Sequence, residues 1–274
     1  MRLVSYEHDG EVGVGIRTDA GIAPTGHTDM VALIASGATP TATGAAFEPD
    51  RILVPLRPGK VLCAGINYKS HGAEASSALP QEPYFFAKLP NAVCGPGDPI
   101  RIPSPDTLTD WEVEFAFVIG KRAKNVAAAD ALDYVYGYTL LHDVSARDIQ
   151  FGWSKRTQDT QIILGKNPDT FSPIGPEIVT KDELTDPFNV RVATYVNGEM
   201  KQDANTSDWI FPIPVLIEFL TQVITLEPGD VVSTGTPAGC GAFLDPPQYL
   251  QPGDEVTIEA EGIGRLTNPV VAGW

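Results

Sequence analysis

The tripeptide Pro-Gly-Asp occurs three times in this chain, and each copy stands directly before an apolar or alternating run. The copies lie at 96–98, 228–230 and 252–254. Proline and glycine in neighbouring positions favour a reversal of the chain, and the run after each copy has the period of a strand. Asn197-Gly198, between two alternating arms over 190–202, indicates a hairpin of the same kind. The main body is therefore predicted to consist mostly of strands.

The beginning of the chain predicts a small unit of its own. Alternating runs on either side of Asp9-Gly10 indicate a hairpin. A short helix with an apolar face should follow, with Thr28 as its cap and Gly37 at its end. A stretch rich in Thr, Ala and Pro comes next and is typical of a connection. We expect a small N-terminal α/β unit over residues 1–50 and the main body over 51–274.

Helices in the main body are expected to be few and short. The best candidates are 128–135, 145–151, which Ser145 can cap, and 212–223, where Pro212 or Pro214 suits the first turn. No repeat of solenoid type is visible. The predicted fold class is α+β, a mixed, strand-dominated roll with the small N-terminal unit in front.

Charge and hydropathy exclude several kinds of partner. Thirty-five acidic and nineteen basic residues give a formal net charge of −16, which repels nucleic acid and anionic membranes and leaves carboxylates for a hard cation. The three cysteines, Cys63, Cys94 and Cys240, form no CxxC pair, so neither a disulfide framework nor a zinc site is indicated. The charged start and the proline-interrupted apolar segment at 209–220 predict no secretion signal and no membrane span. We expect a cytoplasmic protein.

One apolar strand carries two carboxylates. In the segment Asp110 to Gly120, Glu112 and Glu114 should point to one face, because side chains of a strand alternate, while the intervening apolar residues point to the other. Two buried carboxylates side by side are unfavourable unless a cation binds them. The alternative is an edge strand with two solvated glutamates. A third ligand would favour the metal site.

Asp143 is the candidate third ligand, because it ends an apolar run over 138–142 that has the pattern of a neighbouring strand. The alternative is that Asp143 only caps the following helix. In that helix Arg147 and Gln150 are three residues apart and share a face, so both can be directed at one ligand. Arg147 could instead form a surface ion pair with Asp148 or Asp143.

His71 and Glu74 form a candidate general base. They follow an apolar strand over 60–64, and their spacing of three places them on one face of a helical turn. The carboxylate can then orient the imidazole for proton transfer. The alternative is a structural or exposed histidine.

Several motifs in order resemble those of the fumarylacetoacetate hydrolase family, especially its shorter members of the acylpyruvate hydrolase type. The resemblance runs from about Val61 to Val270. The motifs are Asn67-Tyr68-x-x-His71-x-x-Glu74, Glu112-x-Glu114, Asp143-Val-Ser-Ala-Arg147-Asp-Ile-Gln150, Gly165-Lys166-x-x-Asp169-Thr170, Val196-Asn197-Gly198-Glu199 and Thr234-Gly235-Thr236-Pro237. The long form of the family has an extra aspartate ligand where this chain reads Gly65-Ile66-Asn67, so a three-carboxylate site is expected.

The resemblance implies roles for the site residues. Mg²⁺ or Mn²⁺ would bind Glu112, Glu114 and Asp143, with the catalytic Lys166 near the metal. The residues expected to contact substrate are Arg147, Gln150 and Thr236. The resemblance also implies a homodimer. Two features depart from the family, namely Cys240, where an aliphatic residue is usual, and the segment 153–164, and both are expected to bear on substrate identity.

The expected reaction is hydrolysis of a C–C bond in a small 2,4-dioxo acid of the acylpyruvate or fumarylpyruvate type, with water activated by His71 and Glu74. The same ligands would serve decarboxylation of oxaloacetate, or isomerisation or hydration of a 2-hydroxy-dienoic acid, and fold alone cannot choose among these. A non-enzymatic binder of metal or carboxylate is the rival of another class. His71 and Lys166 argue against that rival.

Overall fold

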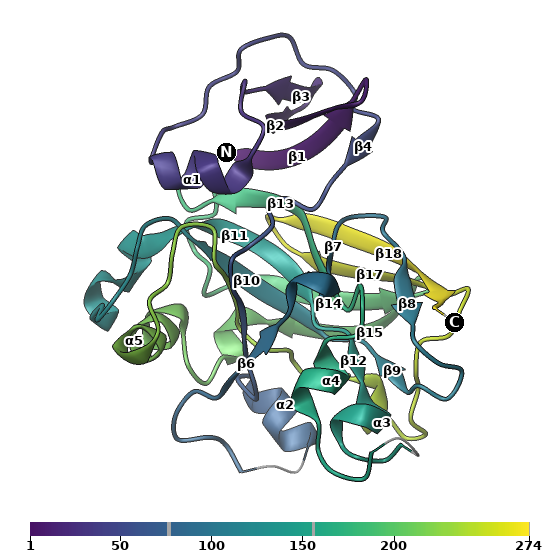
Figure 1. Cartoon of the computed structure of the whole chain (residues 1–274). Coiled ribbons are helices and arrows are strands. Elements are labelled where there is room, and N and C mark those ends of the chain that lie inside the picture. Colours follow the sequence, from purple (N-terminus) through teal and green to yellow (C-terminus); the bar gives the residue numbers. More distant parts are fainter. Residues whose placement is uncertain (76–77, 155–156, 274) are drawn as a thin grey trace.

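The structure is a computed structural model that describes residues 1–75, 78–154 and 157–273. Its main body is built from two mixed sheets, with few and short helices at the periphery (Figure 1). This confirms the predicted strand-dominated α+β roll. The larger sheet has, in spatial order, β3 (Gly21–Pro24), β2 (Glu11–Thr18), β1 (Arg2–His8), β13 (Ser172–Thr180), β11 (Val135–His142), β10 (Val113–Ile119), β16 (Val231–Ser233), β5 (Val61–Ala64) and β6 (Phe85–Lys88), with β4 (Arg51–Ile52) beside β1 and β7 (Val93–Cys94) beside β13.

The second sheet stands against the larger one and contains the predicted hairpin. Asn197 and Gly198 both have positive φ, 51° and 80°, as a tight two-residue hairpin requires. The strand order is β15 (Glu199–Asn205), β14 (Arg191–Val196), β17 (Glu255–Ala260), β18 (Gly264–Ala272) and β8 (Ile100–Ile102), and a separate pair joins β9 (Thr109–Asp110) to β12 (Ser145–Ala146). Each Pro-Gly-Asp copy precedes a strand, β8, β16 or β17, as predicted.

The helices differ in detail from the expectation. They are α1 (Met30–Ser36), α2 (Lys69–Glu74), α3 (Arg147–Gln150), α4 (Ile162–Lys166) and α5 (Ile213–Val223), with 3-10 turns η1 (Pro90–Ala92), η2 (Ala128–Tyr134), η3 (Thr206–Asp208) and η4 (Gly241–Phe243). Asp29, not Thr28, caps α1, because its side chain accepts from Ala32 N. Ser145 is no cap either, since it lies in β12 and donates to Asp143 O. The candidate at 128–135 is a 3-10 turn. None of the described helices is long and apolar enough to cross a membrane.

Strand β10 separates two apolar layers. Phe115 and Phe117 pack in a cluster with residues of the second sheet and α5, whereas Ala116 and Val118 pack in a cluster with α1 on the opposite face. A fully buried strand explains why this run is apolar on both faces. Glu114 lies two residues before Ala116 and four before Val118, so its side chain points to the same face of the strand and into the same covered layer. This excludes the alternative of an edge strand with solvated glutamates.

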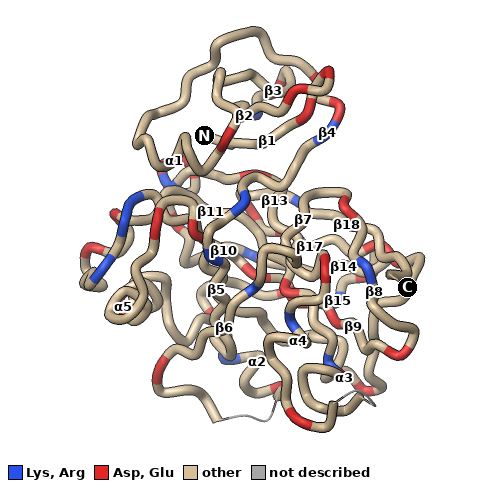
Figure 2. The backbone as a smooth tube through the Cα atoms, in the orientation of Figure 1, with Lys and Arg blue, Asp and Glu red and all other residues tan. Residues whose placement is uncertain are grey.

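The N-terminal unit is continuous with the main body through its first strand. β1 pairs with β13, so the hairpin around Asp9-Gly10 extends the larger sheet. α1 covers the same sheet through Met30, Leu33 and Ile34. Acidic positions occur on both the N-terminal unit and the main body (Figure 2). The division into 1–50 and 51–274 stays a prediction.

Candidate active site

Two neighbouring strands bring three carboxylates to one face of the larger sheet. Glu114 of β10 is paired with Leu141 of β11, and Asp143 N donates to Glu112 O over 3.0 Å. Residues that lie opposite each other point to the same face, and side chains alternate along each strand. Glu112, Glu114 and Asp143 therefore converge, with carboxylate oxygens within 4.8 Å of one another, and all three are buried.

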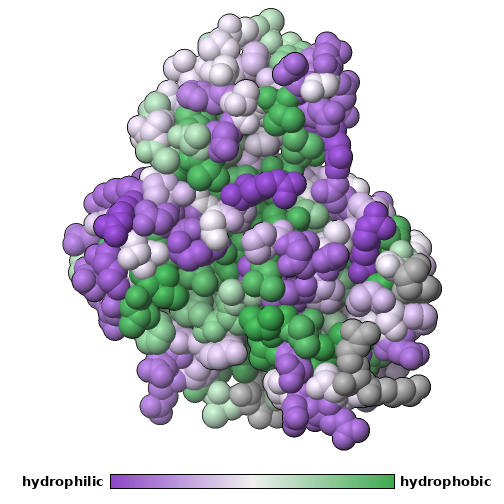
Figure 3. Space-filling model, in the orientation of Figure 1, coloured by the Kyte–Doolittle hydropathy of each residue, from purple (hydrophilic) through white to green (hydrophobic). Residues whose placement is uncertain are grey.

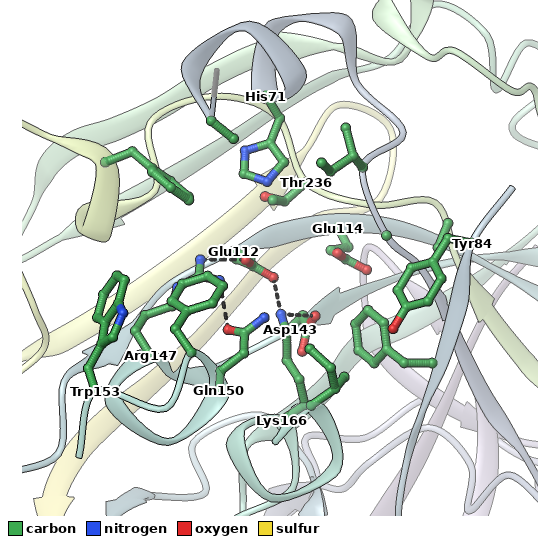
Figure 4. A pocket seen from close by; sticks show the side chains of 18 residues that line it. His71, Tyr84, Glu112, Glu114, Asp143, Arg147, Gln150, Trp153, Lys166 and Thr236 are labelled. Carbon is green, nitrogen blue, oxygen red and sulfur yellow. Dashed lines mark hydrogen bonds and ion pairs between the residues drawn. The ribbon is translucent and has the colours of Figure 1, made fainter. Parts of the chain in front are cut away.

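A lysine bridges two of these carboxylates. Lys166 Nζ donates to Glu112 Oε2 and to Asp143 Oδ2, both over 2.6 Å. Arg147 Nη2 donates to the other oxygen of Glu112, Oε1, over 2.5 Å. Figure 4 shows Arg147 reaching Glu112 from one side and Lys166 rising from below to Glu112 and Asp143, with His71 and Thr236 above the carboxylates. Lys166 thus lies where the family resemblance implied, beside the expected metal ligands.

Asp143 keeps one oxygen without a hydrogen bond. Lys88 Nζ lies 2.5 Å from Asp143 Oδ1 as an ion pair. However, Lys88 directs hydrogen bonds to three backbone carbonyls, those of Val144, Lys166 and Phe171, at 3.0, 2.5 and 2.8 Å. An ammonium has three N–H groups, so these bonds use all of them. Oδ1 of Asp143 is consequently held by the charge of Lys88 and accepts no hydrogen bond from the described residues, so it keeps lone pairs that a bound cation can take.

The buried charges of the cluster do not balance. Four carboxylates face three cations, which leaves a formal excess of one negative charge before any ion is counted. The carboxylates are Asp110, Glu112, Glu114 and Asp143, and the cations are Lys88, Arg147 and Lys166. A divalent cation with a preference for oxygen ligands would reverse that excess.

The directions of the pKa shifts show which of the three carboxylates is least compensated by a neighbouring positive charge. Burial, Asp143 and Glu112 raise the pKa of Glu114 well above its usual value. Burial also raises the pKa of Asp143, against the opposing effect of Lys166. For Glu112, burial raises the pKa, but Arg147 and Lys166 outweigh it and hold the pKa below its usual range. Among the described residues, Glu114 accepts a side-chain hydrogen bond from the Ser233 hydroxyl alone, and it therefore gains most from a bound cation. The three carboxylates fit Mg²⁺ or Mn²⁺.

Arg147 is buried, which excludes the alternative of a surface ion pair. Its Nε donates to Asp110 Oδ2 over 2.8 Å, and its Nη1 donates to Gln150 Oε1 over 3.0 Å. With the bond to Glu112, three of the five guanidinium N–H groups are used, and two remain for a ligand. Asp110 is held in turn by the backbone N–H groups of Gly241 and Ala242. The shared face of Arg147 and Gln150 is confirmed, and their contact with substrate stays a prediction.

His71 and Glu74 form the expected pair. They lie in α2, with His71 Nδ1 3.2 Å from Glu74 Oε2. Gly239 N donates to the other oxygen, Glu74 Oε1, over 2.8 Å and so fixes the carboxylate. Because Nδ1 faces Glu74, Nε2 is the nitrogen left to accept a proton from a ligand. The geometry suits a general base.

Thr236 is held by a residue that the sequence did not single out. Gln202 Nε2 donates to Thr236 Oγ1 over 2.9 Å, while Gln202 Oε1 accepts from Thr194 Oγ1 and from Val113 N. Gln202 thereby ties the second sheet to the start of β10. Since Thr236 Oγ1 accepts from Gln202, its own hydroxyl hydrogen is free to donate to a ligand.

One cavity of about 480 Å³ joins these groups. His71, the three carboxylates, Arg147, Gln150, Lys166 and Thr236 all line it, and Glu74 stands behind His71. Half of the remaining lining residues are aromatic, namely Tyr84, Phe86, Phe151, Trp153 and Phe243. Figure 3 shows apolar side chains gathered over the region of β6 and α4. The nine predicted residues thus come together, although their roles stay predictions.

The two departures from the family lie at this cavity. Trp153 and Ile162, from the segment 153–164, line it, whereas residues 155–156 of that segment lie outside the described residues. Cys240 is fully buried and does not line the cavity; its Sγ lies 3.9 Å from His71 Nδ1.

The fold and the carboxylate cluster together define a fumarylacetoacetate hydrolase-type protein. The family model for the fumarylacetoacetate (FAA) hydrolase C-terminal region matches residues 60–271. The chain belongs to this family of enzymes.

Two related proteins and two solved structures are similar to this chain over most of its length. The chain is 46% identical over 221 residues to the mitochondrial oxaloacetate tautomerase fahd2 of Xenopus laevis, covering 80% of this chain and 68% of that one. It is 46% identical over 215 residues to the mitochondrial oxaloacetate tautomerase FAHD2A of Homo sapiens, covering 78% and 67%. A fumarylacetoacetate hydrolase from Exiguobacterium antarcticum superposes with a TM-score of 0.87 at 34% identity over 99% of both chains. A 5-carboxymethyl-2-hydroxymuconate delta-isomerase from Mycobacterium smegmatis gives 0.83 at 36% identity, over 99% and 100%.

Proposed function

We propose that this protein is a divalent-metal-dependent tautomerase or isomerase of a small 2-oxo dicarboxylic acid of the oxaloacetate type. The observation that carries the proposal is the placement of His71, with Glu74 behind it, in the same cavity as the three carboxylates. A base facing a cation site suits proton transfer next to a carbonyl. The sequence motifs led us to expect C–C hydrolysis. The names of the relatives and of the isomerase structure favour tautomerisation or isomerisation instead.

Each residue of the cavity would have its own role in the reaction. His71 takes the proton from the carbon next to the 2-oxo group and returns it to the enolate oxygen, which gives the enol, and Glu74 stabilises the imidazolium that exists between the two transfers. The two free N–H groups of Arg147 and the hydroxyl of Thr236 bind carboxylate or carbonyl oxygens of the substrate. Lys166, held between Glu112 and Asp143, keeps a positive charge near the oxygen that becomes negative. When bound by Glu112, Glu114 and Asp143, Mg²⁺ or Mn²⁺ supplies Lewis acidity for the 2-oxo acid group.

The aromatic wall favours a second candidate function. A cavity of about 480 Å³ falls in the range of ~300–1,000 Å³ that holds drug-sized ligands, and a four-carbon diacid would leave much of it empty. Tyr84, Trp153 and Phe243 would suit a longer apolar chain. Hydrolysis of an acylpyruvate is therefore the second candidate. In that reaction His71 would take a proton from a water molecule instead of from a carbon of the substrate.

The deciding experiment compares oxaloacetate with a panel of acylpyruvates, each with saturating Mg²⁺. Enol–ketone interconversion of oxaloacetate is followed by the ultraviolet absorbance of the enol, and pyruvate and CO₂ are measured separately. We expect catalysed interconversion with little pyruvate. Rapid pyruvate formation from acylpyruvates, without CO₂, would replace the tautomerase proposal by the hydrolase. Mg²⁺ binding without any turnover would favour the non-enzymatic binder.

His71→Ala separates proton transfer from simple decarboxylation. Tautomerisation and hydrolysis both need a proton acceptor, so the rate should fall roughly 10²- to 10⁴-fold. Decarboxylation of oxaloacetate needs no such base, so any CO₂ release of the wild type should largely persist. Mg²⁺ binding should be retained, as calorimetry would report. A wild-type tautomerisation rate in this variant would refute the assignment of the base.

A further inference from the structure

A second group of metal-ligating atoms lies beside the carboxylate centre. His71, Glu74 and Cys240 present a ring nitrogen, a carboxylate oxygen and a sulfur that all lie within 4.8 Å of one another. His71 Nδ1 is 3.2 Å from Glu74 Oε2 and 3.9 Å from Cys240 Sγ. These atoms are drawn from α2 and from the segment before η4, so the grouping is a product of the tertiary fold.

The two separations from His71 Nδ1 are close to those of a tetrahedral zinc site. Bond lengths of about 2.1 Å to nitrogen and oxygen and about 2.3 Å to sulfur, at tetrahedral angles, give about 3.4 Å for N···O and about 3.6 Å for N···S. The observed 3.2 and 3.9 Å differ from these values by a few tenths of an ångström. The hard cations that suit the carboxylate centre prefer oxygen, whereas imidazole and thiolate together favour Zn²⁺ and its softer relatives.

The surroundings support a bound ion. Gly239 N holds Glu74 Oε1, which leaves Oε2 directed at His71. Besides His71, the sulfur of Cys240 has weak partners within the described part of the chain, namely Pro237 O and Gln202 Nε2, each at 3.8 Å. His71 lines the cavity, so an ion can enter from there, and a water or substrate oxygen can complete the tetrahedron.

We propose that His71 Nδ1, Glu74 Oε2 and Cys240 Sγ form an inhibitory site for Zn²⁺ or a similar thiophilic divalent ion. On binding, the thiol of Cys240 loses its proton to solvent and the sulfur becomes a thiolate ligand. The ion takes the lone pair of Nδ1, so the ring proton must reside on Nε2. An imidazole with Nε2 protonated cannot accept a proton from the substrate, and the base is switched off while the carboxylate centre keeps its own ion.

The spectroscopic test uses Cd²⁺ as a probe of the Mg²⁺-saturated protein. A Cd²⁺–thiolate bond gives an ultraviolet charge-transfer band, which needs no turnover and so does not depend on the reaction proposed above. We expect a band that saturates at one Cd²⁺ per chain in the wild type. Cys94→Ala is the matched control, because Cys94 is also a buried free cysteine but donates to Thr170 O away from His71. The band should persist in Cys94→Ala and vanish in Cys240→Ala and in Cys240→Ser.

The kinetic test measures inhibition by Zn²⁺ at saturating Mg²⁺. Loss of the sulfur ligand should raise the Zn²⁺ concentration for half inhibition at least about tenfold in Cys240→Ala, with activity in Mg²⁺ alone little changed. Cys94→Ala should be inhibited like the wild type.

Absence of the Cd²⁺ band in the wild type, or its persistence in both Cys240 variants, would overturn the site. Equal Zn²⁺ sensitivity of Cys240→Ala and the wild type would show that Zn²⁺ acts by replacing Mg²⁺ at the carboxylates, and would overturn the inhibitory role. Cys240→Ser, which keeps the volume of the side chain, guards against a misfolded Cys240→Ala.

Discussion

Replacing Lys166 with Met tests whether the carboxylate centre is held together by charge. Lys166 Nζ lies 2.6 Å from both Glu112 Oε2 and Asp143 Oδ2, and all three side chains are buried. Methionine fills a similar volume but removes the cation that both carboxylates share. Without a metal ion, the two buried carboxylates then face each other with less compensation.

The magnitude follows from the burial of the pairs. Breaking a buried ion pair by removing one partner costs about 3–5 kcal/mol. A chain of 274 residues unfolds with an entropy of roughly 0.58 kcal/mol/K, so the loss corresponds to a fall in Tm of about 5–9 °C. Arg122→Met is the matched control, because it removes one positive charge from an exposed pair with Glu227. That pair is worth about 0–1 kcal/mol, so the control should lower Tm by less than about 2 °C.

The same variant should bind Mg²⁺ more tightly, because Lys166 and the ion compete for the same negative charge. We expect affinity to rise at least about tenfold, or ~1.4 kcal/mol, and most of the lost Tm to return on adding Mg²⁺. Activity should stay low, since the proposal gives Lys166 a part in the reaction. The assays are thermal unfolding and calorimetric titration with and without the metal. An unchanged Tm in the metal-free variant, or weaker Mg²⁺ binding, would refute the electrostatic reasoning.

Three further predictions concern the metal and the assembly. Glu114→Gln keeps the shape but removes a ligand charge, so calorimetry should find Mg²⁺ binding lost together with metal-dependent activity; full activity after exhaustive chelation of the wild type would contradict a metal centre. Burial, Asp143 and Glu112 raise the pKa of Glu114, so this carboxyl takes up a proton at higher pH than an exposed glutamate does, and an ion that binds it displaces that proton. Mg²⁺ affinity should therefore rise with pH, and titrations in two buffers of different ionisation enthalpy should detect proton release; pH-independent affinity would argue against it. The chain should elute as a homodimer in light-scattering chromatography, whereas a fully active monomer would exclude the assembly implied by the family resemblance.

Alternation and turn chemistry explain what could be predicted from the sequence. The faces of Glu112 and Glu114 follow from a period of two, and the hairpin at Asn197-Gly198 follows from residues that tolerate positive φ. His71 and Glu74 are three residues apart, so one helical turn joins them. These are local properties, which depend on neighbours in the chain. The choice between Thr28 and Asp29 as the cap of α1 shows the limit, because both residue types can cap and only the backbone geometry decides.

The partners of the site residues could not be predicted, because they are distant in the chain. Lys88 reaches Asp143 from 55 positions away, and Gln202 reaches Thr236 from the other sheet. Asp110 stands next to the Glu-x-Glu motif, yet its role as the anchor of Arg147 depends on the pairing of β9 with β12. The signals in the sequence were a lysine at the end of the apolar run 84–88 and a carboxylate two residues before the Glu-x-Glu motif. Residue types and periodicity determine which groups can face one another, whereas the packing of the two sheets and of the short helices determines which of them share a buried charge.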